Sequence, residues 1–395
     1  MRSNANWHRR ESFDCYQREK PERLTILHVA ADGDVGGGTT HVLDLIAGAD
    51  NGARHVVATS AGSALESAAR ARGCETVAIV GFGWRSLFGG FTLRKAASRS
   101  AVDLVHAHGA RSTALAGIAR LSQPIVRTVH GLHIEHHRGA RRRIAKTLER
   151  FADRVAVATV FVSDSDRRAA ERLRLHKADR QTFVIPNGIS VEAFESVRRT
   201  WDLAWVGRLE DVKQPLRFVD IVERMPGCRA VLVGDGSLRD DVATRVKGST
   251  ARARIDVLGS RERSEVHRLL TQAKVLLMTS RNEGVPYVVL EAMAAGAVVV
   301  APRIGGIAEV LGDAGIVVAN TADELVRAAS AVLAAPNERD AIAGIARARF
   351  EDRYDLGRMI AATSDVYRWA LESRVLGGVM VGGDLVSVAA QAASA

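Results

Sequence analysis

Residues Ser280–Gly296 read SRNEGVPYVVLEAMAAG and carry the most informative local pattern in the chain. They follow an apolar run ending near Met278 that is typical of a buried strand, and they continue into the apolar, helix-like stretch Tyr287–Ala294. Glu283 therefore falls in the loop or at the helix start, and Glu291 lies about two helical turns further on. Apolar residues flank Glu291, and a carboxylate buried there needs donors such as sugar or ribose hydroxyls. The competing interpretation is a solvated acidic pair on a surface helix.

Short apolar runs alternate with helix-like stretches on both sides of this segment. Continuously apolar strands between helices are typical of a parallel sheet covered on both faces. The expected strands are Leu24–Ala30, His55–Thr59, Thr76–Val80, Leu104–Ala107, Ile125–Val129 and Thr159–Val162, then Asp202–Val206, Arg229–Val233, Arg254–Leu258, Val275–Met278, Val298–Ala301 and Gly315–Val318. The pattern predicts two α/β units joined near residues 187–200. Parallel sheets bind ligands beyond the carboxyl ends of their strands, so a site between the two units is expected.

A length of 395 residues favours two domains, each large enough for its own core. We expect a disordered tail at 1–21, an N-terminal domain at 22–190, a C-terminal domain at 191–355, and a second tail at 375–395. The polar start predicts no secretory signal, and no apolar run is long enough to predict a spanning helix. Three scattered cysteines with no metal-binding spacing favour a reduced, cytoplasmic compartment.

The net charge of +10 is unevenly distributed along the chain. Residues 1–190 contain 29 Lys and Arg against 18 Asp and Glu, whereas the remainder contains 26 against 27. The basic run Arg138, Arg141, Arg142, Arg143 and Lys146 lies in the first half and could meet anionic lipid headgroups. A basic half that faces something anionic and a solvated basic surface without a partner both remain open.

A second motif lies at Ala204–Pro215, where a strand runs into Gly207 and Arg208 and Lys213 follows at a helix start. Two cations beside a helix N-terminus form a plausible pyrophosphate clamp, and the glycine permits close backbone approach. Two ordinary surface cations are the alternative.

Glycine turns follow several of the expected strands. Gly234 ends the strand before Asp235-Gly236, and Gly305 and Gly306 could meet a phosphate through backbone N–H groups. In the first half, Gly36, Gly37 and Gly38 precede the helix-like stretch His41–Ala49 and could face a phosphate or an acceptor. Plain turns explain each of these glycines equally well.

Histidines cluster in the first half of the chain. The cluster comprises His106, His108, His130, His133, His136 and His137. A histidine cluster can hold a metal, but the spacing gives no four-ligand set with carboxylate or thiolate support, so we expect no metal. His130 comes at the carboxyl end of an expected strand and points toward the expected site between the domains.

Together these motifs resemble the retaining glycosyltransferases of family 4, also called group 1, which have the GT-B fold. The resemblance covers most of residues 24–372 and is strongest at 183–318. It is carried, in order, by Val184-Ile-Pro-Asn-Gly-Ile, Val206-Gly-Arg-Leu with Lys213, Val233-Gly-Asp-Gly, and Glu283 to Glu291. It implies two Rossmann-like α/β domains facing each other across a deep cleft, with the helix at about 356–374 crossing back to complete the N-terminal, acceptor domain.

The resemblance also implies roles for individual residues. Arg208 and Lys213 would hold the donor diphosphate and stabilise the leaving charge, Glu291 would bind the ribose, and Glu283 would bind the transferred sugar. The remaining implied contacts are His130 facing the donor sugar, Gly37 and Gly38 near the phosphates, the strand-end glycines Gly207 and Gly234, and the backbone of Gly284, Val285 and Pro286. Two departures from the family pattern are Gln214, where glycine often follows the lysine, and Thr39-Thr40, which replace a common Glu-Arg pair.

The implied function is sugar transfer from a UDP- or GDP-sugar to a lipid-linked or saccharide acceptor in bacterial envelope or exopolysaccharide synthesis. Two fixed cations can stabilise a departing pyrophosphate, so no divalent metal or other cofactor is expected. The expected location is the cytoplasm, with peripheral attachment to the inner face of the membrane as a further expectation. An alternative is a nucleotide-sugar epimerase of the same fold. Nucleic-acid binding is disfavoured because no aromatic residues interleave with the basic run.

Overall fold

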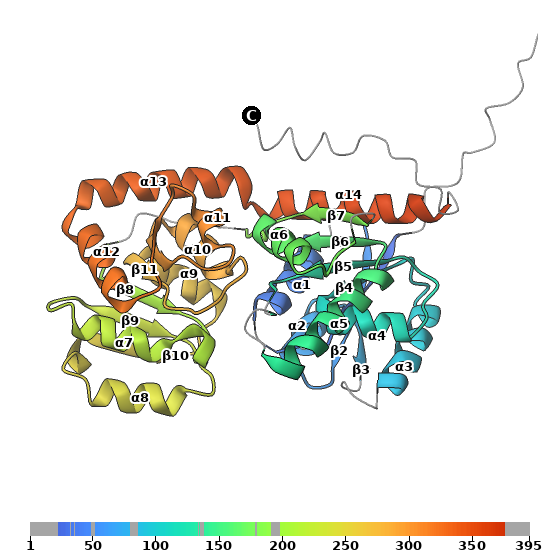
Figure 1. Ribbon diagram of the computed structural model, residues 1–395, viewed down its shortest axis with the longest axis horizontal. Helices are drawn as coiled ribbons and strands as arrows, with labels where there is room; N and C mark the ends of the chain where they lie inside the picture. The colour runs from blue at the N-terminus through green and yellow to red at the C-terminus, as the bar shows by residue number, and fades with distance from the viewer. Residues whose placement is uncertain are drawn as a thin grey trace, which may run out of the picture.

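The computed structural model describes residues 23–31, 33–34, 36–48, 52–79, 86–132, 134, 138–177, 180–190 and 198–375 (Figure 1). The two expected tails, 1–21 and 375–395, lie outside these ranges apart from Val375, which ends the last helix. Two separate parallel sheets, each flanked by helices, lie side by side in the view of Figure 1. The expectation of a two-domain α/β fold is confirmed.

The first sheet contains seven parallel strands in the order β3-β2-β1-β4-β5-β6-β7. The strands are β1 (Thr25–Ala30), β2 (Arg54–Ser60), β3 (Glu75–Ile79), β4 (Leu104–His108), β5 (Ile125–Val129), β6 (Ala158–Phe161) and β7 (Gln181–Val184). The order reverses beside β1, as in doubly wound dinucleotide-binding folds, and this places the loops after β1 and β4 at the switch point.

The second sheet repeats the arrangement with six parallel strands in the order β10-β9-β8-β11-β12-β13. Its strands are β8 (Trp201–Val206), β9 (Ala230–Val233), β10 (Ile255–Gly259), β11 (Ala273–Leu277), β12 (Val298–Pro302) and β13 (Ile316–Val318). Strands β9, β11 and β12 are almost entirely buried, as expected for strands covered by helices on both faces.

Helices connect the strands and cover both faces of each sheet (Figure 1). In the first half they are α1 (Gly37–Ala47), α2 (Ala64–Ala71), α3 (Ser86–Arg99), α4 (Gly109–Ile118), α5 (Gly139–Val155) and α6 (Asp164–Arg172). In the second half they are α7 (Pro215–Glu223), α8 (Arg239–Lys247), α9 (Arg263–Thr271), α10 (Tyr287–Ala295), α11 (Ile307–Leu311), α12 (Ala322–Ala334), α13 (Pro336–Arg353) and α14 (Leu356–Val375). Two 3₁₀ turns, η2 (Asp211–Lys213) and η3 (Arg252–Arg254), follow β8 and α8.

Alternation of side chains along β1 separates two cores on the first sheet. Leu27 packs with α3 and α4 on one face, whereas Ile26 packs on the other face with Leu45 of α1 and with Met359 and Val366 of α14. The last helix therefore returns from the second domain and contributes apolar side chains to the first (Figure 1). His28 alternates with Leu27 and so lies on the same face as Ile26, which α1 and α14 cover.

Two local details differ from the sequence expectation. Gly37 and Gly38 form the first turn of α1 rather than a loop before it, so the expected helix start at His41 was wrong by one turn. Strand β7 was not anticipated, because Gln181–Val184 is short and only partly buried. Backbone pairing with β6 makes this segment a strand, although its composition does not predict one.

Gly234 occupies a position that admits no side chain. Its φ is +146°, and a Cβ built there would lie 1.8 Å from the carbonyl oxygen of Gly207. The ends of β8 and β9 thus approach each other through bare backbone, which requires glycine.

We predict that Gly234→Ala lowers the free energy of unfolding by about 3 kcal/mol, since it combines backbone strain with a clash against a carbonyl. Gly62→Ala is the matched control: its φ is also positive, +72°, but nothing lies within 4 Å of the added Cβ. The control should cost about 1 kcal/mol. Urea denaturation of both variants measures the difference, and equal losses would contradict the close-approach explanation.

Candidate active site

Lys213 and Glu283 are brought together in the second domain. The Lys213 Nζ lies 2.6 Å from one carboxylate oxygen of Glu283 and 2.7 Å from the other. Ser280 donates a further hydrogen bond of 2.6 Å to the same carboxylate. Glu283 is 8% exposed, so its charge depends on these contacts rather than on water. The family resemblance implies that Lys213 binds the donor diphosphate and Glu283 binds the transferred sugar. The structure places these two side chains in direct contact.

Arg208 stands apart from this pair. Its guanidinium contacts Glu210 at 2.8 Å, and its side chain is 49% exposed. A surface pair of this kind contributes little to stability, which leaves the cation available for an anionic ligand. Arg208 and Lys213 nonetheless lie on the same segment, which connects β8 to α7 through η2.

Glu291, on α10, is buried and has two neighbours, Arg263 and His267, that sequence reasoning missed. Arg263 Nε lies 3.1 Å from Glu291 Oε1, and His267 Nε2 lies 3.5 Å from the same oxygen. Arg263 also reaches across to the first domain, where its Nη1 lies 2.8 Å from Asp44 Oδ1 on α1. Its guanidinium stacks over the ring of Tyr287 at 5.4 Å. One arginine therefore links Glu291 to the other domain.

Burial shifts the pKa values of this interdomain cluster. Desolvation raises the pKa of Asp44, although the Arg263 guanidinium opposes the change. Burial by itself lowers the pKa of Arg263, but the carboxylates of Asp44 and Glu291 more than offset this, so the pKa is raised overall. Burial also raises the pKa of Tyr287 well above its ordinary value. The arginine is thus a permanent cation held between two carboxylates.

The loop after β11 meets the first domain at Gly284. A Cβ on Gly284 would lie 2.9 Å from the carbonyl oxygen of His130, which follows β5. Within the second domain, a Cβ on Gly305 would lie 1.7 Å from the Glu283 carbonyl, and one on Gly306 would lie 2.8 Å from the Gly284 carbonyl. Bare backbone on three loops therefore holds Glu283 and His130 at the boundary between the domains.

Gly37 and Gly38 approach the same place from the first domain. The Cβ position of Gly38 faces the His130 ring at 3.8 Å, and that of Gly37 faces the Tyr287 ring at 3.6 Å. The N-terminus of α1 thus lies against His130 and the start of α10. Gly207 belongs to the separate contact with Gly234 at the ends of β8 and β9.

Asn187 ties the segment between the domains to both sides. Its Nδ2 donates to the Val285 carbonyl at 3.0 Å, and its Oδ1 lies 3.0 Å from His41 Nδ1 on α1. Pro286 occupies the position immediately before the first turn of α10. The backbone of the Gly284–Pro286 loop is fixed by an amide side chain as well as by the glycine contacts.

The structure shows how Gln214 replaces the glycine that often follows the lysine in the family. It adopts a left-handed conformation with φ of +55°, which favours glycine. Its side-chain amide donates to the Asp211 carbonyl at 2.6 Å, and this local bond stabilises the turn. The turn that positions Lys213 is therefore formed without the glycine.

Histidine side chains gather on the α1 face of the first sheet. Two groups, His28 with His106 and His108, and His41 with His108 and His130, each bring three ring nitrogens within 4.8 Å of one another. The sequence cluster included His106, His108 and His130 but missed His28 and His41; His133, His136 and His137 lie outside the described residues. Parallel pairing of β1 with β4 sets His28 beside His106, and no local pattern reveals this.

Sequence profiles of two families match consecutive parts of the chain. The profile of the family described as Glycosyltransferase Family 4 matches residues 35–193, and that of Glycosyl transferases group 1 matches residues 192–349. The chain belongs to the group 1, or family 4, glycosyltransferases. The first match covers β2 to β7 and the second covers β8 to β13, so each match falls on one sheet.

Characterised relatives and solved structures of glycosyltransferases agree with this assignment. The UDP-Gal:alpha-D-GlcNAc-diphosphoundecaprenol alpha-1,3-galactosyltransferase of Escherichia coli is 28% identical over 240 residues, which cover 54% of this chain and 61% of the relative. A glycogen synthase of Mycobacterium tuberculosis is 26% identical over 67% of this chain and 68% of its own length. The structure of HepE from Anabaena in complex with UDP-glucose superposes with a TM-score of 0.75 at 19% identity, covering 88% of this chain and all of that one. The fold is therefore GT-B.

We predict that Lys213→Met lowers the free energy of unfolding by about 2 kcal/mol, because it leaves the Glu283 carboxylate buried without its cation. Arg208→Ala is the control, since its partner is exposed and the loss should stay within about 0.5 kcal/mol. Denaturant unfolding curves compare them. A Lys213→Met protein as stable as the wild type would show that Glu283 does not depend on this pair.

Proposed function

We propose that this protein is a retaining glycosyltransferase that moves a hexose from a UDP-sugar to a lipid-linked or saccharide acceptor in bacterial envelope or exopolysaccharide synthesis. The observation that carries the proposal is the Lys213–Glu283 pair beside the Gly284 loop. It sets a cation suited to a diphosphate next to a carboxylate suited to sugar hydroxyls. The HepE structure contains UDP-glucose, which supports a UDP-sugar as the donor. The name of the Escherichia coli galactosyltransferase includes a diphosphoundecaprenol acceptor, which supports a lipid-linked acceptor.

In the proposed reaction, the bond from sugar C1 to the diphosphate oxygen breaks, and its electron pair leaves with the diphosphate. The acceptor oxygen forms the new bond to C1 and loses its proton. Arg208 and Lys213 offset the charge that develops on the leaving diphosphate, so this step uses no metal. His130 is the residue of the first domain that would face the transferred sugar.

Donor recognition follows from the carboxylates and the loop between them. Glu283 and the backbone of Gly284, Val285 and Pro286 hold the transferred sugar. Glu291 accepts hydrogen bonds from the ribose hydroxyls; its contacts with Arg263 and His267 use Oε1, and a carboxylate accepts through both oxygens. Gly37 and Gly38 bring backbone N–H groups of the α1 N-terminus toward the phosphates.

The donor site is tested by thermal-shift screening of UDP, GDP, ADP and their sugars. A nucleotide at 100 times its dissociation constant should stabilise the protein by about 2.7 kcal/mol. We expect UDP and UDP-sugars to stabilise the wild type and Arg327→Ala, an exposed change on α12. Arg208→Ala and Glu291→Ala should lose the shift. Unchanged shifts in both variants would overturn the assigned donor site, and a preference for GDP would change the donor base.

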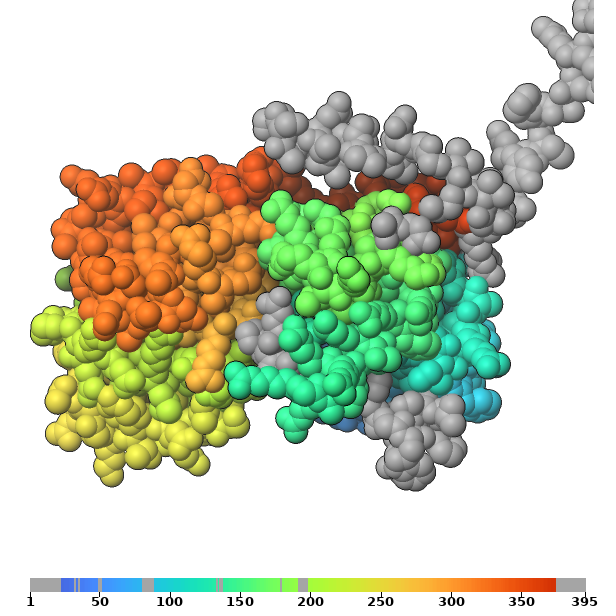
Figure 2. All heavy atoms as spheres, in the orientation of Figure 1, coloured from blue at the N-terminus to red at the C-terminus, as the bar shows by residue number. Residues whose placement is uncertain are grey.

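A membrane-facing role is proposed for α5. The helix and the residue before it expose Arg138, Arg141, Arg142 and Arg143 together with Ile144, whose exposed fraction is 67%. Phe91 is 72% exposed and lies on α3, which packs on α4, as α5 does. Cations that attract anionic headgroups beside apolar side chains that enter the interface are the features of a peripheral docking surface. The helix lies at the front of the molecule in Figure 2.

Within the described ranges, no helix combines the length and apolar character that a membrane crossing needs.

We predict that the protein sediments with vesicles rich in phosphatidylglycerol and not with pure phosphatidylcholine. Arg142→Glu with Arg143→Glu should abolish most of the binding, because each cation near the surface contributes about 1 kcal/mol. Arg327→Glu with Arg347→Glu, on α12 and α13, is the matched charge reversal. Equal loss in both double variants would indicate a net-charge effect, and equal binding to both lipids would remove the membrane role.

A further inference from the structure

Arg263 divides its guanidinium between two carboxylates that belong to different domains. It is the first residue of α9, in the second domain. Its Nε donates to Glu291 Oε1 on α10 at 3.1 Å, and its Nη1 donates to Asp44 Oδ1 on α1 at 2.8 Å. In Figure 1, α9 and α10 lie on the side of the second domain that faces α1. The bond to Asp44 therefore spans the boundary between the domains.

Neither carboxylate receives the two-bond contact that an arginine can form. A guanidinium can hold a carboxylate through two parallel N–H groups, along the edge of Nε and Nη2 or along that of Nη1 and Nη2. Nη2 belongs to both edges, yet Arg263 Nη2 is buried without a hydrogen-bond partner among the described residues. Asp44 Oδ2 is buried in the same unpartnered state within those residues. The guanidinium thus makes one hydrogen bond to each carboxylate instead of two bonds to either.

Burial on both sides maintains this shared arrangement. The side chains of Asp44 and Glu291 are only 11% and 8% exposed. A buried carboxylate that loses its cation is strongly destabilising, so each of the two opposes the departure of Arg263 to the other. The guanidinium also lies over the ring of Tyr287, the first residue of α10, at 5.4 Å. Arg263 is therefore held between the carboxylates and not on one of them.

The shared arrangement determines which oxygens of Glu291 are occupied. Arg263 and His267 both contact Oε1, at 3.1 and 3.5 Å, so neither of these contacts uses Oε2. If Arg263 turned its edge of Nε and Nη2 toward Glu291, the two N–H groups would occupy both oxygens. A carboxylate engaged in this way has fewer lone pairs left for a ribose hydroxyl. Asp44 opposes the turn because it holds Nη1.

We propose that Asp44 is a positioning residue for ribose recognition, which acts through Arg263 to keep Glu291 Oε2 open to the ribose. The inference rests on the proposed function, in which Glu291 binds the ribose of the donor. It assigns part of the donor specificity to the first domain, although the ribose-binding carboxylate lies in the second. Ribose recognition is then strongest when α1 and α9 are in contact, because this contact holds Arg263 in its shared position.

The test separates the ribose contribution from those of the base and the diphosphate. Isothermal titration calorimetry of the full chain compares UDP with 2′,3′-dideoxy-UDP, which lacks both ribose hydroxyls. Asp44→Ala releases Arg263, and alanine is a strong helix former that α1 accommodates. We expect the affinity for UDP to fall about tenfold, the effect of losing a hydrogen bond to a charged group. The affinity for 2′,3′-dideoxy-UDP should stay unchanged, since this ligand makes no ribose contact with Glu291.

A second substitution tests whether Asp44 acts through Arg263. Arg263→Lys keeps a cation beside Glu291, but an ammonium cannot form the planar two-bond fork. Adding Arg263→Lys to Asp44→Ala should therefore raise the affinity for UDP at least about threefold above that of Asp44→Ala alone. A variant that bound poorly because it was misfolded would not regain binding in this way.

The matched control comes from an arginine that bridges two carboxylates within one domain. Arg245 contacts Asp220 and Glu223, all three in the second domain. Asp220→Ala, on α7, likewise removes one of the two carboxylates but leaves the boundary between the domains intact. It should bind UDP and 2′,3′-dideoxy-UDP as the wild type does. Thermal unfolding of both alanine variants, measured before the titrations, checks that they are folded.

The outcomes distinguish failure of this inference from failure of the proposed function. Wild-type affinity for UDP in Asp44→Ala would overturn the inference, as would equal losses for the two ligands, which indicate a packing role. A failure of Arg263→Lys to restore binding, or an equal loss in Asp220→Ala, would overturn it as well. A wild type that binds neither ligand, or binds both equally, would instead overturn the donor site on which the proposed function depends.

Discussion

The loop at Glu283–Gly284 depends on backbone contacts that leave no space for side chains. The Gly305 position approaches the Glu283 carbonyl, and the Gly284 position approaches the His130 carbonyl of the other domain. Because a Cβ at Gly284 or Gly305 would clash with these carbonyls, the loops after β11, β12 and β5 approach one another more closely than a residue with a side chain allows. The carboxylate of Glu283, the start of α10 and the His130 ring all take their places from this junction.

Charge pairing then sets the chemistry on each side of the junction. Lys213 neutralises Glu283 within the second domain, whereas Arg263 neutralises Glu291 and also reaches Asp44 of the first domain. Buried carboxylates without such partners would be strongly destabilising. The same pairs place cations and hydrogen-bond acceptors close together, which suits a ligand that carries both phosphates and hydroxyls. In the first domain, buried histidine side chains instead gather on the α1 face of the sheet.

Much of the fold could be read from short-range pattern. Apolar runs such as Val275–Met278, each followed by a helix-like stretch, predicted parallel sheets, and the order of motifs predicted the family. Pattern failed where tertiary contacts replaced local preference. Gln181–Val184 becomes a strand only through pairing with β6, and Gly37 enters a helix because α1 packs against the boundary between the domains. The site residues Lys213 and Glu283 were recognised separately, but their contact was not.

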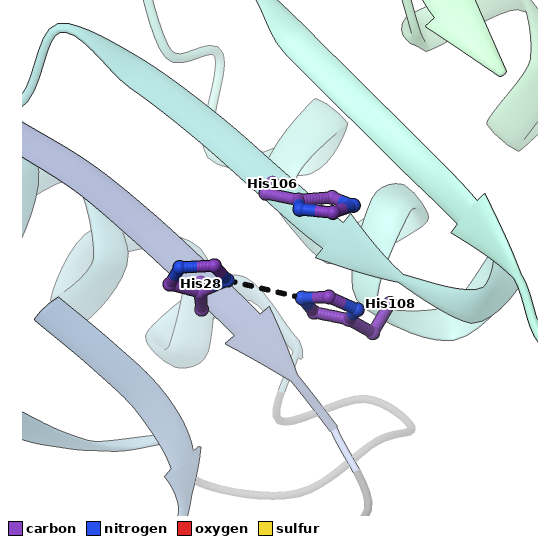
Figure 3. A group of neighbouring side chains, drawn as sticks. All are labelled: His28, His106 and His108. Carbon is purple, nitrogen blue, oxygen red and sulfur yellow. Dashed lines mark hydrogen bonds between the residues drawn. The ribbon is translucent and has the colours of Figure 1, made fainter. Parts of the chain in front are cut away.

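The sequence by itself determined the alternation of strands and helices, the positions of the strand-end glycines, and the family to which the chain belongs. These properties depend on neighbouring residues, whose side-chain periodicity and backbone freedom are local. Only the tertiary structure decided that Arg263 joins Glu291 to Asp44, and that His28 gathers with His106 and His108 (Figure 3). Such contacts depend on the register of parallel strands and on the seating of one domain against the other. Both are set by burial over the whole molecule, so no stretch of sequence encodes either one alone.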